Sequence, residues 1–130
     1  KPVQQRTAVA RGEIRMAPAT LKLIRADKIA KGNVLVTARI AGIQAAKRTS
    51  ELIPMCHPLP INHCEVDFVF PKTGNVIVIT STVKVAAKTG VEMEALTAVN
   101  ITALTIYDMC KAVDKKMCIT NMKLVTKTKQ

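Results

Sequence analysis

Two pairs of ionisable side chains open and close one segment with helical periodicity, residues 92–113. Asp108 and Lys111 are three positions apart, a spacing at which helical side chains meet. On an open surface such a pair is an ordinary ion pair worth about 0.3–0.5 kcal/mol, whereas in a cleft each group tunes the pKa of the other and can transfer protons. Glu92 and Glu94 stand at the start of the segment, where free backbone N–H groups favour negative charge.

A second reactive group lies in residues 54–60, where three prolines exclude both helix and strand ladder. We predict a structured loop there, the kind of segment that commonly carries functional residues. Cys56 and His57 are adjacent in it, and His57 is either an acid, base or phosphate donor, or simply a structural histidine. Together with His63 and Cys64 they suggest zinc, but adjacent ligands fit poorly with the spacing of structural zinc sites, so we expect no metal site.

The charge of the chain indicates an anionic partner. The formal net charge of the 130 residues is +11, and residues 1–48 contribute 11 Lys/Arg against 2 Asp/Glu. This excess fits nucleic acid, a lipid surface or a polyphosphate, or a solvated basic surface. The sequence lacks an apolar run of membrane-spanning length and a signal-peptide pattern, so its four cysteines are expected to be reduced thiols in the cytoplasm.

The elements that must position these groups follow from periodicity. We predict strands over 6–16, 64–70, 75–85 and 117–127, and helices over 20–30, from an Asn33 cap to 48, and over 92–113. Gly74 and Asn75 supply positive φ for a hairpin turn at 72–75. The order predicts a single domain over 1–130 of class α+β, with a ferredoxin-like antiparallel sheet and helices packed on one face.

The apolar spacing also predicts which faces are buried. In the second helix the inward residues are expected to be Val36, Ile40, Ile43 and Ala46. In the two hairpin strands the alternation favours one buried face made by Val66, Phe68 and Phe70 and by Val76, Val78 and Thr80.

Three blocks of the sequence resemble the cyclic pyranopterin monophosphate synthase (MoaC) family over nearly the whole chain. They are 31–35 (KGNVL) with 38–49 (ARIAGIQAAKRT), then 52–58 (LIPMCHP), then 88–97 (KTGVEMEALT) with 103–113 (ALTIYDMCKAV). The resemblance implies a lyase of molybdenum cofactor biosynthesis. Its substrate would be (8S)-3',8-cyclo-7,8-dihydroguanosine 5'-triphosphate, and its products cyclic pyranopterin monophosphate and pyrophosphate.

The resemblance also implies an assembly and a partner. It suggests a ferredoxin-like fold in a homohexamer, a trimer of dimers with sites at the dimer interface. The substrate would come from a radical SAM GTP cyclase. We expect no tightly bound cofactor, with Mg²⁺ accompanying the triphosphate as a reasonable addition. The family commonly ends in a basic Gly-Ser-rich tail, whereas this chain ends in LVTKTKQ, which leaves a lid role for the tail open.

Residue roles carry over from the matching blocks. Asp108 would be the catalytic carboxylate, with Lys111 and Lys31 as catalytic partners. Substrate contacts would come from the remaining candidates, Arg6, Met55, Cys56, His57, Glu92, Met93 and Glu94. In this interpretation the basic first third clamps the triphosphate, the 92–111 helix reads the base and moves protons, and the prolyl loop closes the pocket between them.

Two other functions compete with this reading. The charge of +11 also suits a nucleic-acid-binding ferredoxin-like module, which would need sheet aromatics on which bases stack. A catalytically silent subunit of a larger cofactor-assembly complex is the third hypothesis.

Overall fold

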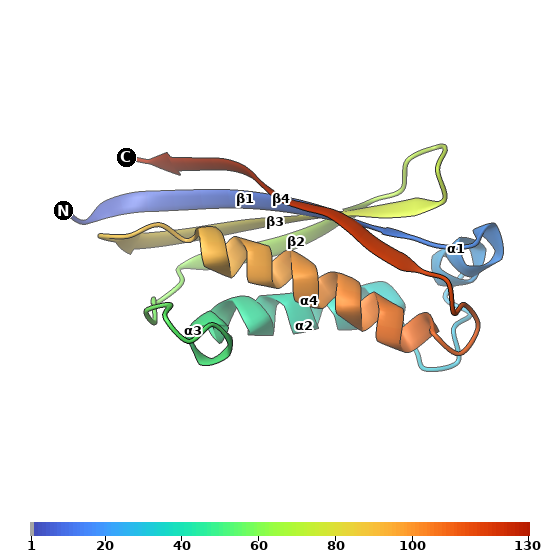
Figure 1. The fold of residues 1–130 in the computed structure, drawn as a ribbon. Helices are drawn as coiled ribbons and strands as arrows, with labels where there is room; N and C mark the ends of the chain where they lie inside the picture. The colour runs from blue at the N-terminus through green and yellow to red at the C-terminus, as the bar shows by residue number, and fades with distance from the viewer. Residues whose placement is uncertain (1) are drawn as a thin grey trace.

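The computed structural model describes residues 2–130 and forms a four-stranded antiparallel sheet with its helices on one face (Figure 1). The elements in chain order are β1 (Gln4–Arg15), α1 (Pro18–Arg25), α2 (Val34–Lys47), α3 (Thr49–Leu52), β2 (His63–Val69), β3 (Val76–Ala87), α4 (Glu92–Cys110) and β4 (Cys118–Lys129). The strand order β2-β3-β1-β4, with every neighbouring pair antiparallel, confirms the predicted α+β class and ferredoxin-like topology.

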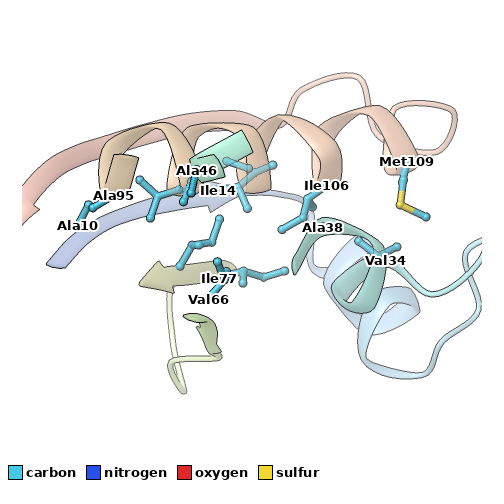
Figure 2. Close-up of a cluster of buried hydrophobic side chains, with 14 of the residues drawn as sticks. Ala10, Ile14, Val34, Ala38, Ala46, Val66, Ile77, Ala95, Ile106 and Met109 are labelled. Carbon is cyan, nitrogen blue, oxygen red and sulfur yellow. The ribbon is translucent and has the colours of Figure 1, made fainter. Parts of the chain in front are cut away.

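The core lies between the sheet and the two long helices. Alternate residues of β1 point to the helices, so Ala8, Ala10 and Ile14 are buried, whereas the intervening side chains face the open side of the sheet. Ile77 and Ile79 of β3 lie opposite β1 on the same face, and Ile106 of α4 packs above them (Figure 2). The open face carries mostly threonine and charged side chains.

The contact between α2 and α4 depends on small residues. Gly42 lies so close to Thr102 and the Ala98 carbonyl that a Cβ at position 42 would overlap the Thr102 hydroxyl oxygen. That hydroxyl donates a 2.7 Å hydrogen bond to the Ala98 oxygen and is fully buried. The two helices therefore pack at a distance that only glycine at position 42 permits.

A buried carboxylate joins the segment that follows α4 to the start of α1. Asp114 accepts hydrogen bonds from the Ala17 amide at 2.9 Å, the Thr20 hydroxyl at 2.8 Å and the Lys116 amide at 3.0 Å. These donors, led by the Ala17 amide, hold the pKa of Asp114 below its usual range. The α4–β4 turn thereby caps the N-terminus of α1.

The first helix is shorter than the predicted 20–30. Asp27 takes a positive φ of 55°, and the amides of Asp27 and Lys28 bond back to the carbonyls of Ile24 and Leu23. This is a Schellman ending with aspartate in the left-handed position, so residues 28–33 form a loop and Ile29 is buried without being helical.

Two predicted faces were only partly right, although Ala46 and Val66 are buried as expected and Ile43, Phe68 and Phe70 pack against the core. In α2, Val36 and Ile40 are 50% and 51% exposed, and the buried residues are Val34, Ala38, Gly42, Ala45 and Ala46. In β3, the residues facing the helices are Ile77, Ile79, Ser81, Val83 and Val85, whereas Val76, Val78 and Thr80 occupy the other face. Both segments are apolar on more than one side, so periodicity alone selected residues from both sides.

Other predictions were confirmed to within a few residues. The Asn33 side chain accepts a hydrogen bond from the Val36 amide at 2.9 Å, as a helix cap does, and Gly74 and Asn75 have positive φ in the hairpin turn. α4 ends at Cys110 rather than at 113, and β4 runs to Lys129 rather than to 127. The short helix α3 was not predicted.

We predict that Gly42→Val lowers the free energy of unfolding by about 1–3 kcal/mol, because the added side chain overpacks the α2–α4 contact. Urea denaturation measures the change. Gln44→Val, on the exposed side of the same helix, carries the same β-branched cost and should change stability by less than about 0.5 kcal/mol. Equal losses in the two variants would refute the packing argument.

We predict that Asp114→Ala destabilises the fold by about 1–3 kcal/mol at neutral pH, because two donors of the α1 cap lose their partner. The native pKa is lowered, so this stabilisation is complete above the unfolded pKa of about 3.9 and is lost as the pH falls through the native value. The difference in free energy of unfolding between wild type and variant should therefore become smaller below about pH 4. Asp67→Ala, an exposed carboxylate, should show no such difference.

Candidate active site

At the N-terminal end of α4, a basic pocket forms around Arg6. It has a volume of about 320 Å³ and is lined by Arg6, Thr7, Thr89, Gly90, Glu92, Lys127, Thr128 and Lys129. Arg6 is buried, and its guanidinium donates to the Lys88 carbonyl at 2.9 Å and the Ala87 carbonyl at 3.4 Å. Arg6 thus anchors the segment between β3 and α4 while adding charge to the pocket.

Lys127 and Lys129 were not among the sequence candidates for this pocket. Both lie on the helix side of β4, where Lys129 is the register partner of Arg6 and Lys127 that of Ala8. The alternation of lysine with threonine at 126–129 places them on one face, but only the β1–β4 pairing brings that face to Arg6. Three cations therefore surround one pocket, a setting that suits a polyphosphate.

Next to this pocket the prolyl loop contacts α4 through Cys56. The Cys56 thiol donates to a Glu94 carboxylate oxygen at 3.7 Å. Glu94 is only 3% exposed, and this burial raises its pKa above the ordinary value. Burial, followed by the charge of Glu94, also raises the pKa of the Cys56 thiol. Sequence reasoning named both residues, and the structure brings them together.

The other candidates at this end are exposed. The side chain of Met55 is 90% exposed, and His57 and Met93 also face outward. Glu92 lies in the wall of the basic pocket beside Gly90, where any Cβ would overlap the Glu92 carboxylate. Six of the predicted substrate contacts, three in the prolyl loop and three in the first turn of α4, therefore surround one end of the helix.

At the opposite end of α4, two lysines hold Asp108. Lys111 Nζ lies 3.0 Å from Asp108 Oδ1, and Lys31 Nζ lies 3.5 Å from Asp108 Oδ2. Lys31 also donates to the Asp108 backbone carbonyl at 3.2 Å. The hydrogen bond and charge of Lys111, and then of Lys31, lower the pKa of Asp108. The predicted Asp108–Lys111 pair is confirmed, and it lies on the surface of the chain.

The Glu94–Cys56 pair and the group of Asp108 with its two lysines do not meet within one chain. Glu94 and Asp108 lie about 21 Å apart along α4, at 1.5 Å per residue. The prolyl loop contacts α4 at the Glu94 end, so within one copy it lies beside only one of the two groups.

A shallow apolar groove links the Asp108 end to the outer surface of the helices. It has a volume of about 400 Å³ and is lined by Ile101, Leu104, Thr105, Tyr107, Asp108 and Lys111. Leu104 is exposed there, as are Val36 and Ile40 of the neighbouring helix α2. The outer side of the helical layer thus combines apolar side chains with the charged group at its end.

The remaining chemistry-bearing residues form no metal site. Residues 2–130 contain no group of three or more His, Cys, Asp or Glu side chains able to hold a metal ion. His63 instead pairs with Glu65 at 2.8 Å on the open face of the sheet. All four cysteines are free thiols. No helix over residues 2–130 is long and apolar enough to cross a membrane.

Comparison with known proteins finds a matching family model and relatives that are more than half identical to this chain. The model of the MoaC family matches residues 1–130. The cyclic pyranopterin monophosphate synthase of Parvibaculum lavamentivorans is 57% identical over 98% of this chain and 80% of its own length. The enzyme of the same name from Brevibacillus brevis is 54% identical over 98% of this chain and 79% of its own. The one from Chloroflexus aggregans is 57% identical over 98% and 77%.

We predict that Glu94→Gln accelerates alkylation of Cys56 by iodoacetamide about two- to fivefold at pH 8, because removing the adjacent charge lowers the thiol pKa while burial still raises it. Peptide mass spectrometry measures the rate, with exposed Cys118 as an internal reference. Glu92→Gln removes a neighbouring charge that does not contact Cys56 and should leave the rate unchanged. A slower reaction in Glu94→Gln would contradict the prediction.

Proposed function

The chain belongs to the MoaC family, and we propose that two copies of it together form each active site of its reaction. That reaction is the lyase step of molybdenum cofactor biosynthesis. (8S)-3',8-Cyclo-7,8-dihydroguanosine 5'-triphosphate becomes cyclic pyranopterin monophosphate, and pyrophosphate leaves. The family match over residues 1–130, with relatives above half identity, carries this function.

The separation of the two groups supports the shared site. A twofold axis places the same surface of both copies face to face, so that one end of a helix meets the other end of its partner's helix. If α4 packs antiparallel on the α4 of a second copy, the Glu94 end of one lies beside the Asp108 end of the other. The exposed stripe Met93, Asn100, Leu104 and Lys111 follows helical spacing along the side that would make this contact. Three such dimers would make the proposed hexamer.

Within this site the basic pocket would bind the triphosphate. Arg6, Lys127 and Lys129 surround it, and their charge would stabilise the negative charge that develops on pyrophosphate as it leaves. Glu92 in the wall of the pocket, and Glu94 at the same end of α4, would accept hydrogen bonds from N–H groups of the guanine-derived ring. Met55, Cys56, His57 and Met93 would enclose the ring.

The Asp108 end of the second copy would supply the proton chemistry. Asp108 stays ionised because two lysines hold its pKa low, so it can accept a proton or orient an ammonium group. Lys111 and Lys31 are each within 3.5 Å of its carboxylate and can exchange protons with the ring that opens. We propose Asp108, Lys111 and Lys31 as the catalytic residues.

The remaining expectations belong to the same proposal. The enzyme would act in the cytoplasm, receive its substrate from a radical SAM GTP cyclase and hold no tight cofactor, with Mg²⁺ arriving on the triphosphate. A nucleic-acid module fits less well, because Phe68 and Phe70 are on the helix side, stacked by Arg39 at 5.3 Å and Arg25 at 4.7 Å. No aromatic side chain lies on the open face of the described sheet strands.

The direct test incubates the purified protein with the cyclic dihydro-GTP intermediate and measures pyranopterin and pyrophosphate. Wild type should form both, and Asp108→Ala should form neither while keeping its circular dichroism spectrum and melting temperature. Normal turnover by Asp108→Ala would remove Asp108 from the catalytic role. A silent subunit would give no product with any variant.

Subunit complementation tests the shared site. Arg6→Ala and Asp108→Ala should each be inactive, because each damages every site. When equal amounts are unfolded together and refolded, random pairing leaves about one quarter of the sites with both ends intact, so activity should return to about 25% of wild type.

The matched control mixes Asp108→Ala with Lys111→Ala. Both changes damage the same end, so no pairing restores a site and the mixture should remain inactive. If each site lay within one chain, the first mixture would also stay inactive, and the two-copy proposal would fall.

A further inference from the structure

The end of the molecule that carries Asp108 is strongly basic beyond the residues of the site. Segments 22–31 and 108–116 together carry seven Lys/Arg against three Asp. The cations are Lys22, Arg25, Lys28, Lys31, Lys111, Lys115 and Lys116. Figure 1 shows α1, the end of α4 and the start of β4 gathered at this end, opposite both chain termini.

The fold holds these segments together by two contacts already described. Asp114 ties the α4–β4 turn to the start of α1 through Ala17 and Thr20, and Lys31 bonds to Asp108 at the end of α4. Lys28 lies three residues from Lys31, and Lys115 and Lys116 directly follow Asp114. The cations therefore border the catalytic end in the folded chain and not only in sequence.

Three of these lysines follow α1 or Asp114 and have side chains that pair with no carboxylate of the described residues. Lys28, Lys115 and Lys116, here called the lysine rim, are exposed, and among residues 2–130 none forms an ion pair with a carboxylate. By contrast, Lys31 and Lys111 are neutralised in part by Asp108, and Arg25 stacks on Phe70. The charges of the lysine rim therefore contribute in full to the electrostatic potential around the site.

We propose that the lysine rim is an electrostatic guide that raises the affinity of the site for its polyphosphate substrate without touching it. This inference rests on the proposed function. In the shared site the rim of one copy borders the Arg6 pocket of the other, so a triphosphate is attracted from both sides. Charges within a Debye length of about 8 Å at physiological salt still act on a polyanion, and several weak attractions add up on one carrying three or four negative charges.

The test compares steady-state kinetics of wild type and the triple variant Lys28→Gln/Lys115→Gln/Lys116→Gln between 20 and about 300 mM salt, a range over which screening changes strongly. The variant should raise KM about three- to tenfold at low salt, leave kcat unchanged and show a flatter salt dependence. Inhibition by inorganic tripolyphosphate should weaken by a similar factor.

A matched control changes three cations on the open face of the sheet. Arg11, Lys84 and Lys123 lie there, on the side away from the helices, so Arg11→Gln/Lys84→Gln/Lys123→Gln removes the same net charge away from the site. Its KM should stay within about twofold of wild type, since screening confines the effect to nearby charges.

Each of the following outcomes would refute the proposal that the lysine rim guides the substrate. Equal KM changes in both triple variants would mean a general effect of net charge, and no change in the rim variant would mean that the lysines are only solvated. A changed kcat or oligomeric state would place them in the machinery or an interface. A defect seen only when the cyclase supplies the substrate would make the rim a protein-docking surface. An inactive wild type would refute the proposed function instead.

Discussion

The length of α4 is the constraint on which the rest of the structure depends. Its backbone hydrogen bonds make it a rigid spacer, and the Gly42–Thr102 contact fixes it against α2. The ionisable groups at its two ends are therefore held about 21 Å apart, and no side-chain movement can bring them together. A chain of this fold that uses both groups on one small molecule must obtain one of them from another copy.

The two ends of α4 also shift the pKa of a carboxyl group in opposite directions. Burial raises the pKa of Glu94, whereas Lys111 and Lys31 lower that of exposed Asp108. Carboxyl groups whose environments shift their pKa values in opposite directions are the usual arrangement for separate acid and base roles. In the proposed dimer these two environments face each other across one substrate. The antiparallel packing would thus set a carboxyl group with a raised pKa opposite one with a lowered pKa.

Local features of the fold could be predicted from the sequence, because a few neighbouring residues determine them. The Asn33 cap, the Gly74–Asn75 turn and the Asp108–Lys111 pair are examples, each confirmed. Lys127 and Lys129 could not be found in this way, because only pairing between the two ends of the chain brings β4 to Arg6. The distance between the two ends of α4 follows from helix length alone, and the resemblance implied sites at a dimer interface.

The exposed apolar residues of α2 have the same explanation as the proposed shared site. Apolar spacing indicates which residues are buried in the functional assembly of a protein, and one chain would be only part of the proposed dimer. Val36 and Ile40 are exposed here, as is Leu104 on α4, and all three lie on helices whose opposite sides fill the core. Exposed apolar side chains on a continuous helical surface are typical of an interface. Val36 and Ile40 were expected to be buried and are exposed in the single chain. A second copy that covered these helices would bury them.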